Sequence, residues 1–179
     1  VIDGVHYTGG CSTRHGAYPF CENLDLPSYS LAKSIAAGIA LMRLEHLHPG
    51  AALAKIRDYV PECASDHRWD DVSFVNTLDM ATGLYRSVVD QQDEDADGTG
   101  RFFFPADHAH KIQYACHEYD RQAPPGTTWV YHTSDTYVLG VALERFVQRR
   151  RGPKADYYRD LLVGPLWRPL GLSPSLAVT

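Results

Sequence analysis

Several features that would direct a chain to a membrane, a nucleic acid or a metal are absent from this sequence. No apolar run reaches the roughly 20 residues that a membrane-spanning helix needs. No basic stripe is present, and the formal net charge of −5 disfavours binding to a phosphate backbone. The cysteines lack the C-x-x-C spacing typical of metal sites. The 179 residues, 44% of them apolar, therefore predict a single globular domain, residues 1–179, with a hydrophobic core.

The cysteines leave two interpretations open near the N-terminus. Cys11 and Cys21 flank a short loop rich in Gly, Pro and Tyr, where a disulfide and two free thiols fit the sequence equally well. A bridge there would suit an oxidising compartment, so we expect a periplasmic or secreted location if it forms. For Cys63 and Cys116 we expect free thiols.

The spacing of apolar residues predicts a mostly helical chain. We expect the acidic segment 91–100 to be a surface loop and the segment 1–7 to form a short strand. The arginines at 149–151 continue a helical pattern and indicate a helix C-terminus, favoured by the helix dipole, rather than a binding patch. Helices are expected at 29–47, 51–57, 72–80, 106–119, 134–150 and 157–163, followed by a proline-rich exit at 165–172.

An S-x-x-K tetrad, Ser30 to Lys33, opens the first predicted helix. Positions i and i+3 share a helix face, so the Lys33 amine would lie beside the Ser30 hydroxyl and could take its proton. The free backbone N–H groups at a helix start could also stabilise an oxyanion there. Taken alone, the same pattern fits Ser30 as a helix N-cap and Lys33 as a solvated first-turn residue.

A second polar motif, Tyr131-His132-Thr133, follows the Pro125-Gly126 turn about a hundred residues later. A phenol near Lys33 could relay a proton between Ser30 and a leaving group. The plain alternative is a core tyrosine with a satisfied hydroxyl. The adjacent segment 134–136 reads S-D-T, and it is either a rival motif of S-D-N type or a helix N-cap.

Four further segments accompany the tetrad in a fixed order. They are VSFVNTLDMATGLY (72–85), PGTTWVY (125–131), YVLGVALE (137–144) and PLWRPLGL (165–172). Together with the tetrad, this order resembles the serine β-lactamase and penicillin-binding-protein superfamily. The Tyr at the second motif is most similar to the class C β-lactamase-like branch, which includes D,D-peptidases, class C-related esterases and 6-aminohexanoate-dimer-type amidases.

The resemblance implies an α+β fold in which an antiparallel sheet packs on a helical region. This chain would hold mainly the helical region, because no K-T-G, K-S-G or H-x-G triplet of the family's third motif follows residue 133; the DGTG segment 97–100 precedes the second motif. We therefore expect the chain to be a fragment that lacks the third-motif region. A second chain, or a remaining segment of the same polypeptide, would carry most of the sheet and one oxyanion donor.

The resemblance also implies the chemistry. Ser30 would be the nucleophile, Lys33 and Tyr131 would relay protons, and the protein would hydrolyse a small ester or amide through an acyl-enzyme, with no cofactor. Tyr29, Trp129 and Thr133 would contact substrate, although Thr133 stands where the family usually has Asn, which weakens the case for β-lactam hydrolysis. The alternatives are a β-lactamase or D,D-peptidase specifically, and a catalytically inactive binding module.

The acidic residues offer a weaker site. Asp93, Asp95 and Asp97, with Gly98, match the first half of a calcium-binding loop, but the Glu that completes such a loop is replaced by Phe104. We therefore favour a solvated acidic loop over a calcium site. The histidine pairs 46/48 and 108/110 are spaced by two and would not share a helix face, so the sequence predicts no zinc site.

Overall fold

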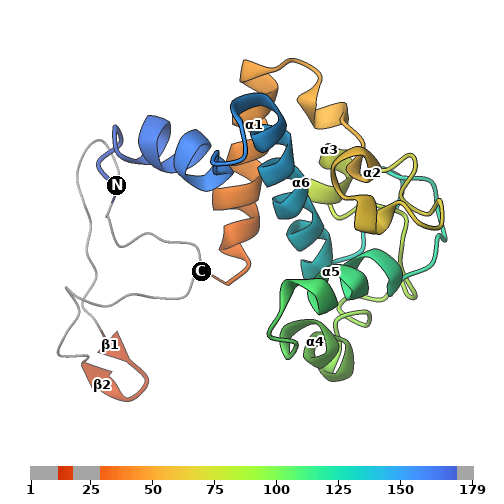
Figure 1. Cartoon of the computed structure of the whole chain (residues 1–179). Coiled ribbons are helices and arrows are strands. Elements are labelled where there is room, and N and C mark those ends of the chain that lie inside the picture. Colours follow the sequence, from red (N-terminus) through yellow and green to blue (C-terminus); the bar gives the residue numbers. More distant parts are fainter. Residues whose placement is uncertain (1–11, 18–28, 173–179) are drawn as a thin grey trace.

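The computed structural model describes residues 12–17 and 29–172, and this part of the chain is mostly helical (Figure 1). Its strands are β1 (Ser12–Thr13) and β2 (Gly16–Ala17), which pair as a small antiparallel hairpin. The described residues contain no larger sheet. The predicted strand at 1–7 lies outside the described residues.

The helices include four that depart from the standard α form. Two are π-helical, with wider turns, and two are short 3₁₀ turns. In chain order they are η2 (π, Lys33–Gly38), α1 (Ile39–Leu47), η3 (3₁₀, Ala51–Leu53), α2 (Ile56–Tyr59), η4 (3₁₀, Pro61–Cys63), α3 (Phe74–Leu78), α4 (Ala96–Phe103), α5 (His108–His117), α6 (Thr133–Arg151) and η5 (π, Tyr158–Trp167).

The predicted first helix is confirmed, but it begins at Leu31 instead of residue 29. Tyr29 has a φ of 46°, in the left-handed region, so it cannot continue a right-handed helix. Elements α3, α5 and α6 confirm three further predictions. The predicted helix 51–57 is divided into η3 and α2 by extended backbone at Ala54 and Lys55, and η5 continues through Pro165 where an exit was expected.

The acidic segment is not the surface loop that the sequence predicted. Asp95 is the N-cap of α4, and its carboxylate accepts a hydrogen bond from the Gly98 amide at 2.8 Å. Asp93, two residues earlier, is buried with 4% of its surface exposed. A capping aspartate therefore turns the second half of this segment into a helix, and in the first half the Asp93 side chain is buried.

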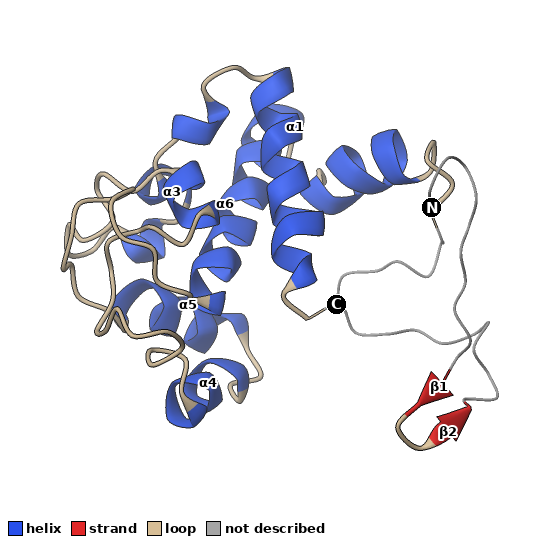
Figure 2. Cartoon of the chain, turned by 180° about the vertical axis from the view of Figure 1, so that it is seen from behind, coloured by secondary structure: helices blue, strands red, loops and turns tan. Residues whose placement is uncertain are grey.

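Helix α6 is the central element. The helix formed by η2 and α1 lies beside it in both views, and α2, α3 and α5 also pack against it (Figures 1 and 2). One continuous core joins these elements, and its largest fully buried side chains include Trp69, Phe74, Phe146, Leu44, Ile56, Leu139, Leu143, Leu161 and Leu162.

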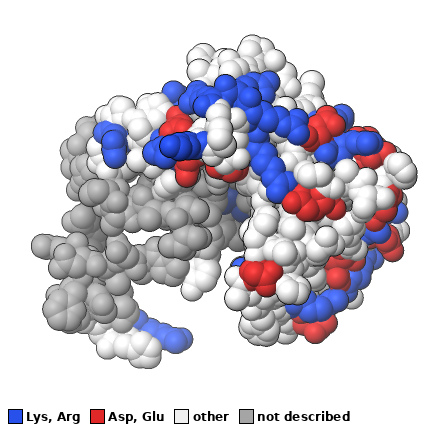
Figure 3. Space-filling model, in the orientation of Figure 1, with Lys and Arg blue, Asp and Glu red and all other residues white. Residues whose placement is uncertain are grey.

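The C-terminal end of α6 is basic, as the sequence predicted. Lys and Arg side chains gather over the part of the surface where this helix ends (Figure 3), and its last turn carries Arg149, Arg150 and Arg151. The guanidinium of Arg149 lies 4.5 Å from the ring centroid of Tyr59, and that of Arg150 lies 3.7 Å from Phe146. Two of the three arginines therefore cover aromatic core residues.

The expectation of free thiols at Cys63 and Cys116 is wrong, because these residues form a disulfide. Cys63 ends η4 and Cys116 lies in the last turn of α5, and both are buried where these elements meet. The Trp69 indole donates a hydrogen bond to the Cys116 carbonyl at 2.8 Å beside them. Cys11 and Cys21 lie outside the described residues.

The turn at Thr82-Gly83-Leu84 directs the chain toward the second motif. Gly83 has a φ of 79°, and a Cβ there would lie 2.0 Å from the Ala123 carbonyl oxygen. Only glycine allows this approach, in which Gln122 donates to the Gly83 carbonyl at 2.8 Å and Val130 to the Met80 carbonyl at 3.0 Å. These bonds hold the segment that ends at Tyr131.

None of the described helices has the length and apolar character needed to cross a membrane.

Candidate active site

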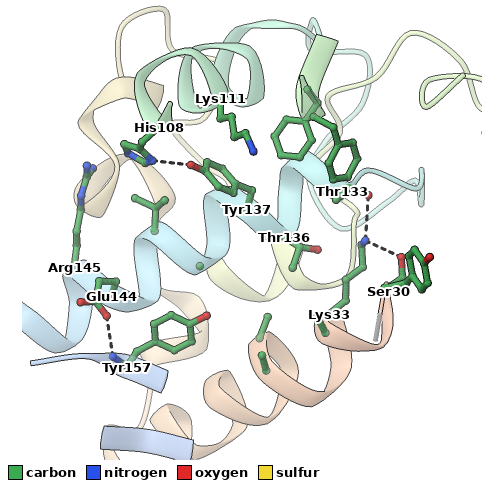
Figure 4. Close-up of a pocket in the computed structure, with 18 of the residues that line it drawn as sticks. Ser30, Lys33, His108, Lys111, Thr133, Thr136, Tyr137, Glu144, Arg145 and Tyr157 are labelled. Atoms are coloured by element: carbon green, nitrogen blue, oxygen red, sulfur yellow. Dashed lines mark hydrogen bonds between the residues drawn. The ribbon is translucent and has the colours of Figure 1, made fainter. Parts of the chain in front are cut away.

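The structure brings Ser30, Lys33, Tyr131 and Thr133 together, although the two pairs are about a hundred residues apart in the sequence. The Ser30 hydroxyl is hydrogen-bonded to the Tyr131 hydroxyl. The Lys33 Nζ lies 3.2 Å from Ser30 Oγ and 3.2 Å from Thr133 Oγ1 (Figure 4). It also lies 3.0 Å from Tyr131 OH. The start of the first helix and the start of α6 supply the two sides of this cluster.

Lys33 is the centre of the cluster. An ammonium has three N–H donors, and each of them here has a different hydroxyl oxygen as its acceptor. The ammonium also lies 4.7 Å from the centroid of the Tyr131 ring. No carboxylate of the described residues forms an ion pair with it. The hydroxyls of Ser30 and Tyr131 therefore sit beside a positive charge that has no carboxylate of the described residues at ion-pair distance.

The positive charge of Lys33 affects the pKa of Tyr131. Partial burial by itself would raise the pKa of the phenol, but hydrogen bonds with Ser30 and Lys33 and the ammonium charge together hold the pKa below its ordinary value of 10.0. A lowered pKa makes the phenolate more accessible near neutral pH. The phenolate is thereby suited to take the proton of Ser30.

Thr133 has a partner that the sequence did not indicate. Its hydroxyl donates to Glu94 Oε2 at 3.0 Å, and its backbone N–H donates to the other oxygen of the same carboxylate. Because the hydroxyl proton is used for Glu94, the Thr133 oxygen is left to accept from Lys33. Glu94 falls in the segment that the sequence predicts to be a solvated acidic loop. No local sequence pattern identifies it as the partner of Thr133.

Ser30 lies at the exposed end of its helix, after a strained residue. Tyr29 adopts the left-handed conformation, which is uncommon for a non-glycine residue and is concentrated at functional sites. Turn-type bonds follow, from the Ala32 amide to the Tyr29 carbonyl at 3.1 Å and from the Lys33 amide to the Ser30 carbonyl at 3.0 Å. Ser30 is therefore held at the helix start.

Buried ionisable side chains contact His132, the central residue of the second motif. His132 has Asp93 Oδ2 3.0 Å from its Nε2 and Asp135 Oδ2 3.7 Å from its Nδ1, and its ring stacks on Tyr119 at 4.1 Å. Burial alone would lower the pKa of His132, but the two carboxylates outweigh it and raise the pKa above its ordinary value. This group fixes the peptide between Tyr131 and Thr133.

The same contacts decide between the sequence alternatives for the segment 134–136. Ser134 and Asp135 are both 2% exposed, and they lie inside the first turn of α6. His132 is the N-cap residue, and its own side chain makes no capping hydrogen bond. The N-cap interpretation of Ser134 and Asp135 is therefore wrong, and the Tyr131 alternative is the one that brings a hydroxyl to Lys33.

The three aspartates of the calcium candidate are used elsewhere. Asp93 accepts from the amides of Arg86 and Ser87 at 2.9 and 3.0 Å, in addition to its bond with His132. Asp95 caps α4, and Asp97 pairs with Arg101 at 3.3 Å. In the part of the chain that the structure describes, no cluster of three or more metal-ligating side chains is found.

A cavity of about 770 Å³ adjoins Ser30 (Figure 4). Tyr29, Ser30, Lys33 and Thr133 line it at one end, and its walls continue along α6 toward α4 and α5. Trp129, the other expected substrate contact, is 55% exposed and packs against Tyr131 with ring centroids 6.3 Å apart, but it does not line the cavity.

No family model, curated protein or solved structure matches this chain.

Proposed function

We propose that this protein is a serine hydrolase that acts on an ester or amide through an acyl-enzyme intermediate. The observation that carries the proposal is the convergence of Ser30, Lys33 and Tyr131, each within hydrogen-bond distance of the other two. A nucleophile, a base with a lowered pKa and a fixed positive charge are the parts that acyl transfer requires. The family resemblance of the motifs that carry these residues supports the same assignment.

Acylation begins with Tyr131 as its phenolate. The phenolate oxygen accepts the proton of Ser30 while Ser30 Oγ forms a bond to the substrate carbonyl carbon, which gives a tetrahedral oxyanion. Lys33 remains protonated and stabilises the phenolate before the transfer. The intermediate then collapses, the bond to the leaving group breaks, and Tyr131 returns its proton to the departing oxygen or nitrogen.

Deacylation repeats these steps with water. The Tyr131 phenolate takes a proton from water, the hydroxide oxygen attacks the acyl carbon, and Ser30 leaves as it recovers the proton from Tyr131. The released product is a carboxylic acid, and the site returns to its starting protonation state. No cofactor takes part in these steps.

The tetrahedral oxyanion needs hydrogen-bond donors that stabilise its negative charge. The Ser30 N–H lies at the start of a long helix, where amides have no intrahelical partner and the dipole favours negative charge. We infer that a second donor comes from a strand of the antiparallel sheet that the resemblance implies, carried by a further segment or a second chain. One such donor contributes about 3–4 kcal/mol of transition-state stabilisation in enzymes where it has been removed.

Thr133 favours an esterase or amidase over a β-lactamase or D,D-peptidase. Its hydroxyl accepts from Lys33 and donates to Glu94, so it offers no free amide group to a substrate. An asparagine at this position would have both a donor and an acceptor. We therefore expect simple esters to be better substrates than β-lactams.

Covalent labelling tests the proposal against a catalytically inactive binding module. A fluorophosphonate probe should label the protein, and Ser30→Ala should abolish labelling while the folded helical signal in circular dichroism is retained. Ser34→Ala, at an exposed serine on the same helix, is the matched control and should label normally. Labelling that persists in Ser30→Ala would exclude Ser30 as the nucleophile, and absence of labelling in the wild-type protein would favour the binding module.

A further inference from the structure

The cavity beside Ser30 has apolar walls and two polar groups without partners. Ala36 and Ala37 of the first helix, Phe102 and Phe103 of α4, and Val141 of α6 form much of the wall. Its volume of about 770 Å³ is within the range of pockets that enclose small organic ligands. An apolar chain attached to Ser30 would have room here.

The other polar side chains at the far end of the cavity already have hydrogen-bond partners. Arg145 donates to both oxygens of Glu62, at 2.6 and 2.7 Å. Glu144 accepts from the Gln148 side chain at 2.6 Å and from the Tyr157 amide at 2.8 Å. The imidazole of His108 is hydrogen-bonded to the Tyr137 hydroxyl at 2.7 Å (Figure 4).

Lys111 is different from these groups. Lys111 is a half-buried residue of α5, and its ammonium projects into the cavity and lies 6.0 Å from the centroid of the Phe102 ring (Figure 4). Within the described residues it forms no ion pair or side-chain hydrogen bond, and the nearby Asp107 carboxylate is paired with His110 at 2.6 Å. A cation with apolar neighbours and no counter-ion is a recognition group for an anion.

Thr136 supplies the second observation. Its hydroxyl oxygen is buried and has no hydrogen-bond partner, although this side chain lines the cavity between Lys33 and Tyr137 (Figure 4). Buried hydroxyls in folded proteins almost always have a partner. A ligand atom that accepts or donates a hydrogen bond would satisfy it.

The position of Tyr131 indicates which part of the substrate enters. Ser30, Lys33 and Thr133 line the cavity, but Tyr131 does not. Since Tyr131 protonates the leaving group in the proposed mechanism, the leaving group departs outside the cavity, and the acyl group that stays on Ser30 extends into it. This step rests on the proposed function.

We propose that the cavity binds the acyl group of the substrate, and that this group is an apolar chain ending in a carboxylate that pairs with Lys111. Thr136 donates a hydrogen bond to an acceptor on the same chain. The substrates are then half-esters or half-amides of aliphatic dicarboxylic acids. The released product is the free dicarboxylic acid.

Matched esters test this assignment. The p-nitrophenyl half-esters from succinate to suberate are compared with the p-nitrophenyl esters of the monocarboxylic acids of equal chain length. The wild-type protein should prefer the best half-ester over its neutral counterpart by about 10- to 100-fold in kcat/KM, as one charge-assisted hydrogen bond allows. Lys111→Met should remove that preference, and Lys111→Arg should keep most of it.

The outcomes separate the two proposals. Two results overturn the inference but keep the serine hydrolase proposal. One is Ser30-dependent hydrolysis in which neutral esters and half-esters react at equal rates. The other is a preference for half-esters that is unchanged in Lys111→Met. If no ester is hydrolysed, the proposed function fails, and calorimetry on Ser30→Ala still tests the cavity. Adipamic acid should then bind at least about tenfold more tightly than hexanamide in a Lys111-dependent manner, and equal binding overturns the inference.

Discussion

Lys33 connects three hydroxyls that have different tasks. In the proposed mechanism, Ser30 loses a proton, Tyr131 gains it, and Thr133 stays in place. All three oxygens lie 3.0 to 3.2 Å from the same ammonium. A fixed charge without a counter-ion favours the anionic form of whichever neighbour has the lowest pKa, and in this cluster that neighbour is Tyr131.

The pH dependence of activity should therefore follow Tyr131. Because the phenolate is the proposed reactive form and the pKa of Tyr131 is lowered, kcat/KM should rise with pH and reach a plateau. The apparent pKa of this rise should lie below 10.0. Tyr131→Phe should lower kcat/KM by about 10²- to 10⁴-fold and remove this ascending limb. Stopped-flow or plate assays across the pH range measure both, and an unchanged profile in Tyr131→Phe would exclude the phenol as the base.

Thr133 offers a second test at the residue scale. Thr133→Val keeps the shape but removes the oxygen that accepts from Lys33, and it should lower kcat/KM by about 10- to 100-fold. Thr133→Ser keeps the hydroxyl and should retain most of the activity. Equal losses in both variants would point to packing instead of the hydrogen bond from Lys33 through Thr133 to Glu94.

The residues of the cluster differ in how far the sequence predicts them. Ser30 and Lys33 are linked by helical spacing, and Tyr131 by its motif, so local patterns are sufficient to propose them. Glu94 and His132 reach their partners only through the path of a loop and through burial. Their roles depend on tertiary contacts that no local spacing encodes.

At the scale of elements, the disulfide joins η4 to α5 over a separation of 53 residues. Closing a loop of that size restricts the unfolded chain, and chain-entropy arguments give about 4 kcal/mol of stabilisation. The double variant Cys63→Ala/Cys116→Ala should therefore have a clearly lower free energy of unfolding in urea. A reductant should weaken the wild-type protein similarly and leave the variant unchanged; equal sensitivity would contradict the bridge.

Gly83 determines the approach of the segment that carries Tyr131. Gly83→Ala combines a positive φ with a Cβ that would lie 2.0 Å from a carbonyl oxygen, so we expect a loss of at least about 2 kcal/mol. Gly152→Ala is the matched control, since its φ is 97° and nothing lies within 4 Å of the added atom. If the two variants lose the same stability in denaturant unfolding, the close approach does not contribute.

Helices were more predictable than the boundaries between them. Apolar periodicity is a property of the local sequence, and it identified the helices that became α1, α3, α5 and α6. The division of 51–57, the helical half of the acidic segment and the continuation through Pro165 depend on capping and packing by other parts of the chain. Local propensity therefore fails at these places.

At the scale of the whole molecule, the buried His132 between two carboxylates links stability to pH. The folded state raises the His132 pKa above 6.5, so this contribution is fully present below 6.5 and is lost as the pH rises through the higher folded-state value. The free energy of unfolding should fall over that window in the wild-type protein. His132→Gln should flatten this fall, whereas the exposed-site control His46→Gln should keep it; an unchanged fall in His132→Gln would contradict the account.

The described residues form a helical scaffold with an exposed hydroxyl–lysine cluster, which we propose to be catalytic, and an adjoining cavity, which we propose to bind the acyl group. The described residues hold one short hairpin in place of the sheet that the motifs imply, so the second wall of the site is a proposal about a further segment or chain. The sequence motifs predict the residues of the cluster. The cavity and the position of Lys111 depend on how the helices pack, and the sequence does not predict them. The chemistry of Ser30 is the claim on which the rest depends.

Intact-protein mass spectrometry during turnover of an activated ester tests that claim most directly. The account predicts a transient mass increase equal to one acyl group, located on Ser30 by peptide mapping, absent in Ser30→Ala and formed more slowly in Tyr131→Phe. An adduct on another residue, or ester hydrolysis that continues unchanged in Ser30→Ala, would contradict it.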